Sequence, residues 1–265
     1  MLFRPEVWAD EFAMYFAEQR SLLDLVSRFD NLAQTQGQGE TIKIPALELD
    51  AAKPIVPGAD AVAAVVTDGT VDLVLNQFRG HLIQVKPQDE RFNHKDWRQA
   101  ILKEQARKQK MDTDTALAAV ATDALVTQEV NAGGGVWTDA LVLEAQQKLD
   151  DAEFPTEGRI LLASPAAYND LAQITTFISK DFGDGQGQRK VAYVRDFELV
   201  KLPTNRFAGN PKACMAFHPS AIGAAVARPH MRLADRGGKF DSVIELGAIW
   251  GFKIRKAAGI VRFLR

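Results

Sequence analysis

The sequence NHKDWRQAILKEQARKQKMDTDTALAAVATDALVTQEVN, residues 93–131, contains no Pro or Gly between Lys95 and Val130. Ala, Leu, Lys, Gln, Glu and Arg dominate it, and these residue types favour a helix. The stretch therefore predicts one helix, roughly 50 Å long at a rise of ~1.5 Å per residue. A compact globule of this chain length has about the same diameter, so such a helix indicates a flat, elongated molecule.

The two halves of this predicted helix differ in charge. From Arg91 to Lys110 seven residues are Lys or Arg and two are acidic, whereas from Met111 to Asp150 seven are acidic and one is Lys. Residues 103–110 are polar apart from Ala106, so they have no apolar stripe to bury and are expected to form a solvated face. The alternative is a surface that lies over a polyanion, with four cations beside phosphate groups: Lys103, Arg107, Lys108 and Lys110. An apolar face is expected further along, from Leu117, Val120, Ala121, Ala124 and Leu125.

Composition places the chain among ordinary soluble proteins, because 46% of its 265 residues are hydrophobic and 25% are charged. A formal net charge of −2 argues against a free-standing nucleic-acid binder. The single cysteine, Cys214, excludes a disulfide framework within the chain and a Cys-based zinc site. The N-terminus lacks the pattern of a signal peptide, and no apolar stretch reaches the ~20 residues of a membrane span. We therefore expect a protein that is made in the cytoplasm and has no membrane partner.

Large aromatic residues are concentrated in the first thirty residues. Trp8, Phe12 and Phe16 recur at helical spacing after Pro5, which suits the first turn of a helix. Two interpretations are open at this point. The rings belong either to a terminal helix packed on its own core or to an arm that buries them against a neighbouring subunit.

Residues 41–49 alternate between apolar and polar positions in the manner of a strand, and the segments 62–66, 71–75 and 82–85 predict further strands. Pro54 and Pro57 mark turns, and Asp68-Gly69 predicts a tight turn between strands. The segment has few large apolar side chains, so it predicts a hairpin-rich insertion with exposed strand edges. Monomeric proteins avoid such edges, and a partner chain that pairs with them would remove the problem.

The second half of the chain predicts an α+β domain. A helix capped by Thr138 or Asp139 is followed by the buried strand 159–163 and by a helix that Ser164-Pro165 opens. The remaining expected elements are strands at 191–194, 197–200 and 213–217, a short helix at 221–226, and strands at 242–246, 248–254 and 260–264.

No catalytic, cofactor-binding or metal-binding constellation emerges from the sequence. The glycines at 183, 185 and 187 lack the following helix of a phosphate-binding loop. Cys214 and His218 would share one face of a strand, but a small buried thiol beside a strand-end His explains them without chemistry. We expect no enzymatic activity and no cofactor.

The order of these elements, together with local sequence, resembles the major capsid proteins of tailed bacteriophages. An aromatic N-terminal arm, a hairpin loop, a long helix, an α/β domain and returning strands follow one another as they do in that family. Four stretches are similar to family motifs: LDDAEFPTEGRILLASPAAYNDL (149–171), VAYVRDFELVKLPTN (191–205), MAFHPSAIGAAVARP (215–229) and GAIWGFKIRKAAGIVRF (247–263). The family often has Gly where this chain has Asp196.

By this resemblance the chain would have an α+β fold of the Hong Kong 97-like kind. The implied parts are an N-terminal arm (1–33), an extended β-hairpin loop (34–88), a peripheral domain (89–153) with a spine helix at 91–131, an apical domain (154–229), and return strands of the peripheral domain (230–265).

The resemblance also implies a function. The chain would assemble through pentamers and hexamers into an icosahedral shell around double-stranded DNA, in the host cytoplasm, and would reside in the virion capsid. Its partners would be copies of itself, the portal, the packaged DNA, and scaffolding or decoration proteins. The DNA-facing candidates are Arg98, Lys103, Arg107 and Lys110. The candidates for contacts between subunits are Trp8, Phe12, Phe16, Pro54 and Pro57.

Two alternatives stay open. An encapsulin-type nanocompartment shares the fold implied by the resemblance but encloses protein cargo instead of a genome. An α/β enzyme with an unrecognised site is disfavoured, because no constellation of catalytic residues was found.

Overall fold

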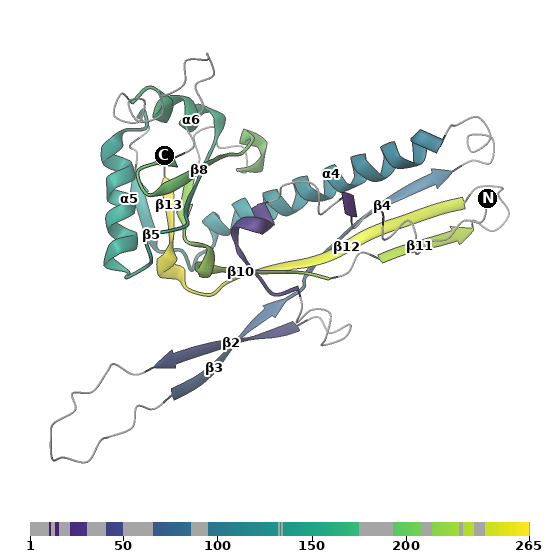
Figure 1. The fold of residues 1–265 in the computed structure, drawn as a ribbon, viewed down its shortest axis with the longest axis horizontal. Coiled ribbons are helices and arrows are strands. Elements are labelled where there is room, and N and C mark those ends of the chain that lie inside the picture. The colour runs from purple at the N-terminus through teal and green to yellow at the C-terminus, as the bar shows by residue number, and fades with distance from the viewer. Residues whose placement is uncertain are drawn as a thin grey trace.

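A computed structural model describes residues 11, 14–15, 22–30, 41–49, 66–85, 95–131, 133, 135–174, 193–207, 214–227, 230–235 and 242–264. In these residues the protein is an elongated α+β body that contains two sheets, and a third, two-stranded sheet projects from it as an arm (Figure 1). No helix in the described ranges is long and apolar enough to cross a membrane.

A five-stranded sheet forms one end of the body, with strand order β1-β10-β12-β11 and β4 on the second edge of β12. The strands are β1 (Ser27–Arg28), β4 (Gln77–Val85), β10 (Ile222–Val226), β11 (His230–Asp235) and β12 (Ser242–Ile254). One continuous strand, β12, pairs antiparallel with β4 along one edge and with β11 and then β10 along the other. The helix α4 (Lys95–Ala119) lies along this sheet (Figure 1).

A six-stranded sheet forms the other end, in the order β5-β13-β9-β6-β8-β7. Its strands are β5 (Gln128–Asn131), β6 (Arg159–Ala163), β7 (Tyr193–Val194), β8 (Phe197–Lys201), β9 (Cys214–Phe217) and β13 (Ile260–Leu264). The helix α5 (Asp139–Asp151) buries Val142, Ala145 and Leu149 against it. The Ser164 hydroxyl caps α6 (Pro165–Ala172) by accepting a hydrogen bond from the Ala167 N–H. The predicted helices after 138 and 164 and the predicted strands at 159–163, 197–200 and 213–217 are confirmed.

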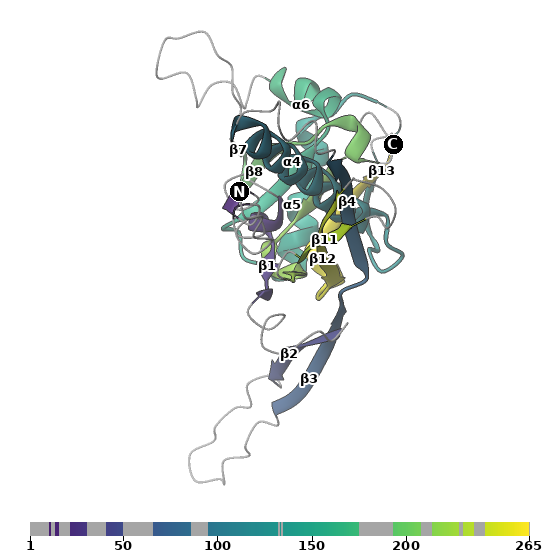
Figure 2. The ribbon, with the colours of Figure 1, turned by 90° about the vertical axis from the view of Figure 1, so that its right-hand side faces the viewer.

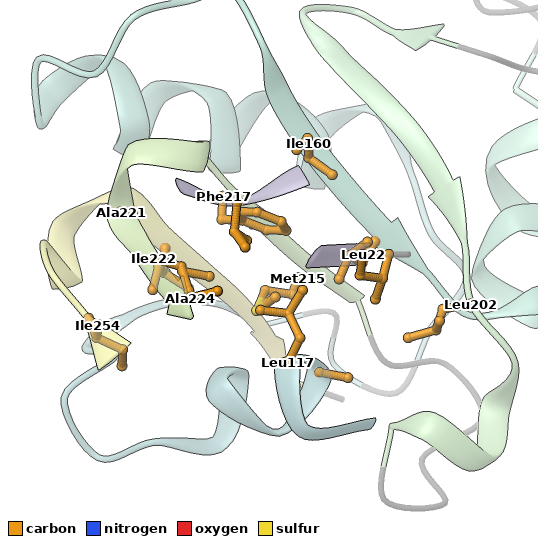
Figure 3. Close-up of a cluster of buried hydrophobic side chains, with 14 of the residues drawn as sticks. Leu22, Leu117, Ile160, Leu202, Met215, Phe217, Ala221, Ile222, Ala224 and Ile254 are labelled. Atoms are coloured by element: carbon orange, nitrogen blue, oxygen red, sulfur yellow. The ribbon is translucent and has the colours of Figure 1, made fainter. Parts of the chain in front are cut away.

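A shared apolar core joins the two ends of the body (Figure 3). Leu117 from α4, Leu162 from β6, Phe217 from β9 and Ile222 from β10 are all fully buried in it. A polar tie supplements this core, because Arg206 donates from Nη1 to the Met111 carbonyl at 2.9 Å. The six-stranded sheet is therefore fixed to α4 and to the five-stranded sheet through one continuous interior.

The two-stranded arm consists of β2 (Thr41–Leu49) and β3 (Val66–Val74), and both views show it clear of the body (Figures 1 and 2). Its base packs Ile42 and Leu73 against Ala225 in β10. The predicted strand that starts at Thr41 is confirmed as β2, the predicted strand at 71–75 is the end of the longer β3, and the predicted strand at 82–85 lies in β4. Residues 62–65 of the remaining predicted strand lie outside the described ranges. The predicted turn at Asp68-Gly69 is wrong, because these two residues lie within β3 and pair with Leu47 and Ala46.

The predicted helix over 93–131 is too long, because α4 ends at Ala119 and has 25 residues. At ~1.5 Å per residue it measures roughly 37 Å. A 3-10 turn, η2 (Val120–Thr122), follows, and the Asp123 carboxylate then accepts the Leu125 N–H at 2.9 Å. Such a local side-chain bond competes with the helix ladder, and β5 beyond it pairs in parallel with β13. The predicted apolar face is also wrong at its end, since Leu125 is 54% exposed.

The predicted short helix at 221–226 is wrong as well. A 3-10 turn, η4 (Pro219–Ala221), is followed by strand β10. Its small residues fit between two neighbours, because β10 pairs with β12 on one edge and β1 on the other. Tertiary pairing therefore overrides the local preference of the AAV sequence for a helix.

The part of the N-terminal segment that the structure describes packs on the chain's own core. Leu22 and Leu23 lie in η1 (Leu22–Leu25) and are buried beside α4, where the Leu22 N–H donates to the Asp114 carboxylate at 3.1 Å. Tyr15 is also buried. The own-core interpretation therefore holds for these residues, whereas Trp8, Phe12 and Phe16 lie outside the described ranges.

We predict that Phe217→Ala lowers the free energy of unfolding by about 3–5 kcal/mol, since it opens a cavity where the two sheets meet. Phe217 is fully buried, whereas Tyr193 is 65% exposed. Tyr193→Ala removes an aromatic ring of similar size and is expected to change the free energy by less than about 0.5 kcal/mol. Urea denaturation of both variants in the same state of assembly tests this, because subunit contacts shift apparent stability. Equal losses would contradict the role of Phe217.

Candidate assembly and nucleic-acid surfaces

The β2–β3 arm has a buried face and an open face. Ile42, Ile44 and Leu73 are buried at its base, whereas Lys43 and Asp72, which pair across the strands, are exposed. In the part of the chain that the structure describes, no third strand pairs with either outer edge of this sheet. Each edge therefore presents free backbone N–H and C=O groups, and such groups are a template for pairing with another chain.

The helix α4 is two-sided, and the sequence did not reveal this. Ala106 and Gln109 are almost completely buried, although residues 103–110 were expected to be solvated, and Leu102 just before them is buried as well. The buried stripe is partly polar, because the amide nitrogens of Gln105 and Gln109 are buried without a hydrogen-bond partner. The opposite side carries the cations, since Lys103, Arg107 and Lys108 are exposed. Only that side of the helix is available to a polyanion.

Two of the four predicted DNA-facing cations are engaged within the chain. The Arg107 guanidinium forms a bidentate ion pair with Glu104, with Nε–Oε2 and Nη2–Oε1 distances of 2.7 and 2.6 Å. This hydrogen bonding lowers the pKa of Glu104 and raises that of Arg107, and the nearby charge of Lys108 also lowers the pKa of Glu104. The ammonium of Lys103 lies 5.2 Å from the centre of the Tyr15 ring and is held there by a cation–π contact.

The other cations have different positions. Lys110 is half-buried, whereas Lys108 is exposed and close enough to Glu104 for its charge to lower the pKa of that carboxyl group. Arg98 lies in α4, but its side chain is outside the described part. The residue that the sequence reasoning missed is Glu104. Its i, i+3 spacing to Arg107 and i, i+4 spacing to Lys108 were a readable signal, because such pairs meet on a helix surface.

The predicted intersubunit residues Trp8, Phe12, Phe16, Pro54 and Pro57 lie outside the described ranges and stay predictions. The described surface nevertheless exposes apolar side chains that the sequence analysis did not select. They are Met14, Val74, Leu125, Val136, Leu143, Tyr193 and Leu264.

Cys214 and His218 do not form a nucleophile and base. Cys214 is buried, and this burial raises the pKa of its thiol far above the ordinary value. The His218 ring instead lies beside Phe154, with Nδ1 2.7 Å from the Ser220 hydroxyl. In the described residues no group of three or more His, Cys, Asp or Glu side chains is placed to hold a metal ion.

Comparison with known proteins gives a structural match without a sequence match. No family model and no curated protein matches the chain. A structure from Mycobacterium phage Che8 is 21% identical, with a TM-score of 0.68 over 92% of this chain and 91% of that one. The capsid structure of cyanophage P-SCSP1u is 15% identical, with a TM-score of 0.69 over 92% and 88%. A virus-like particle from Pyrococcus furiosus is 13% identical, with a TM-score of 0.58 over 98% of both chains.

The chain therefore has the α+β fold of tailed-phage major capsid proteins. Nearly the whole chain takes part in the match, so the resemblance inferred from the order of the elements is confirmed at the level of the fold. The predicted domain boundaries stay predictions, and so do the assignments of residues 1–33 as an N-terminal arm and of 91–131 as a spine helix.

We predict that His218 makes the subunit sensitive to mild acid. Burial, together with the charge of Arg159, lowers the pKa of His218 from its ordinary value of 6.5. The unfolded chain therefore takes up a proton near this value while the folded chain does not, so the free energy of unfolding falls as the pH drops below about 6.5. Urea denaturation between about pH 7 and pH 5 should show a smaller loss for His218→Gln. An identical pH dependence in both proteins would contradict this.

Proposed function

We propose that this chain is the major capsid protein of a tailed bacteriophage, which assembles through pentamers and hexamers into an icosahedral shell around double-stranded DNA. The observation that carries the proposal is the projecting β2–β3 arm, whose two outer edges are unpaired in the described residues. The shared fold with phage capsid structures supports it.

The geometry supports assembly through contacts between unlike surfaces. An arm anchored at Ile42, Ile44 and Leu73 reaches beyond the body of its own subunit (Figure 1). When such an arm lies on the body of the next copy, the contact is heterologous and repeats by rotation until a ring closes. Rings of five and six copies then tile a closed shell.

The proposed contact with DNA is weak and independent of sequence. Lys103, Arg107, Lys108 and Lys110, together with Arg98, would face the interior and neutralise phosphates. Glu104 offsets part of this charge, and the whole chain has a formal net charge of −2. This partial cancellation of positive charge suits a shell that must hold a genome without binding it tightly.

The remaining assignments follow from the same proposal. The protein would be assembled in the host cytoplasm and would reside in the virion capsid. Its partners would be the portal and scaffolding or decoration proteins, in addition to its own copies and the DNA. The role is structural, without an enzymatic activity, a cofactor or a membrane partner.

The second candidate is an encapsulin-type compartment that encloses protein cargo. The match to the Pyrococcus furiosus virus-like particle over 98% of both chains favours it, although its TM-score of 0.58 is below those of the phage structures. The contents of the shell distinguish the two candidates.

We predict that the recombinant protein elutes in size-exclusion chromatography as rings or closed shells, which negative-stain microscopy would resolve. The unpaired edges and exposed apolar side chains are the physical reason. A compact, stable monomer at high concentration would contradict the proposed function. Shells from the native source that contain nuclease-protected DNA support the capsid, whereas shells filled with another protein support the compartment.

We predict that Glu104→Gln strengthens DNA binding by the dissociated full-length chain, because it releases Arg107 and Lys108. The slope of log affinity against log salt should become steeper by about 1–2, at ~0.9 per additional phosphate contact on duplex DNA. Measurements with a short duplex over a salt series test this.

The matched control is Glu144→Gln, which removes the same charge from an ion pair with Lys148 on α5. It should leave the salt slope unchanged. Equal changes in both variants would show that only net charge matters and that the face of α4 is not the DNA contact. The combined Lys108→Gln and Lys110→Gln change should make the slope shallower.

A further inference from the structure

We propose that Gly251 sets the direction in which the β2–β3 arm leaves the body, and that this direction decides whether copies of the chain can assemble. The inference rests on the proposed function, since it concerns the surface through which subunits would meet. It assigns Gly251, in the middle of the long strand β12, as a positioning residue for assembly.

The location of Gly251 is the first step. The arm ends at Val74, and after Leu75 and Asn76 the chain enters β4, where Gln77 pairs with Trp250 of β12. The next residue of β12 is Gly251. It therefore lies beneath the short connection through which the arm joins the body.

The close approach of the backbone is the second step. A Cβ atom at position 251 would lie 2.2 Å from the Val74 carbonyl oxygen, 3.0 Å from the Val74 carbonyl carbon and 3.1 Å from Leu75 Cα. All three are main-chain atoms, so no side-chain rotation relieves the overlap. Any residue other than glycine must displace the connection itself.

The length of the arm amplifies this displacement. The overlap requires a shift of about 1 Å over the roughly 10 Å between Val74 and Gln77, which is a tilt of about 6°. Eight residues of β3 separate Val74 from Val66, or about 26 Å at ~3.3 Å per residue, so the far end moves by roughly 3 Å. The two strands are paired residue for residue from Thr41–Val74 to Leu49–Val66 and would move together.

A displacement of this size is large for a surface that must match a neighbour. Specific interfaces pack as closely as protein interiors, so a misplacement of ~1 Å already removes contacts. Each subunit repeats the same error around a ring, and the shell therefore fails to close although each subunit is folded.

Three glycine-to-alanine variants distinguish an effect on the direction of the β2–β3 arm from an effect on the stability of the fold. Gly251→Ala carries the proposed effect. Gly223→Ala is the side-chain comparison in the same sheet, because its Cβ would meet only side-chain atoms at 3.3–3.4 Å, from Arg255, Phe29 and the arm residue Ile44, and these can yield without displacing main chain. Gly259→Ala is the control for destabilisation, since its Cβ would lie 2.5 Å from the Phe154 ring, away from the arm.

The first measurement compares assembly with stability. We expect Gly251→Ala to raise the lowest concentration that gives shells in light scattering by at least about tenfold, which corresponds to ~1.4 kcal/mol per subunit. Its urea midpoint should stay closer to the wild type than that of Gly259→Ala. If Gly251→Ala unfolds as readily as Gly259→Ala, Gly251 is a packing residue and the proposal is wrong.

The second measurement follows the arm directly. Spin labels at Thr70→Cys on β3 and Thr122→Cys on the body, both at exposed positions, give the arm-to-body distance by pulsed electron resonance. The native Cys214 is buried and should not be labelled in the folded protein. We expect Gly251→Ala to shift this distance by roughly 2–3 Å and Gly259→Ala, whose Cβ would meet Phe154, to leave it unchanged.

The outcomes distinguish this inference from the proposed function. If the wild type forms no shell, the proposed function is wrong. The change in arm-to-body distance in Gly251→Ala then decides by itself whether Gly251 sets the direction of the arm. If the wild type and Gly251→Ala assemble at the same concentration, or the distance is unchanged, the inference is wrong while the capsid assignment stands.

Discussion

The burial of both faces of strand β9 is the constraint on which the rest of the structure depends. Cys214 and Ala216 point into the core beneath α5, whereas Met215 and Phe217 point into the core shared with α4 and the five-stranded sheet. A strand that is buried on both sides cannot move without opening two cores. The two ends of the body therefore behave as one rigid unit, and a rigid body is what allows a projecting arm to have a defined direction.

The surface of the body combines groups that are already paired within the chain with groups that are left open to a partner. The face of α4 carries cations, yet Glu104 holds Arg107 and the Tyr15 ring holds Lys103. Exposed ion pairs of this kind contribute little to stability, so their main effect is on what the surface attracts. Likewise, the arm is anchored by an apolar base but leaves its edges open. The interior of the described residues is therefore closely packed, whereas the edges of the β2–β3 arm are left without a pairing strand in these residues.

Much of the fold was predictable where local signals agreed with tertiary packing. The run 159–163, which is apolar after Arg159, became a strand with every residue buried, and Ser164-Pro165 began a helix as its capping chemistry requires. The failures arose where a single contact overrode composition. After Ala119 the Ala-rich helix region gives way to a 3-10 turn and a local Asp123–Leu125 hydrogen bond, and pairing with β12 makes 222–226 a strand. For the candidate surfaces, the sequence located the cations, and the i, i+3 spacing of Glu104 and Arg107 carried a signal for their ion pair. The contact of Lys103 with Tyr15 could not be predicted, because it depends on the folded path of the N-terminal segment.

The continuous strand β12 has a mechanical consequence. Its hydrogen bonds to β4 on one edge and to β11 and β10 on the other run across the strand direction. Tension along β12 therefore loads many of these bonds together in shear, instead of peeling them one after another. If the chain forms the proposed shell, pressure from packaged DNA would stretch each subunit in its own plane, and a strand that is hydrogen-bonded on both edges along most of its length would resist that stretching.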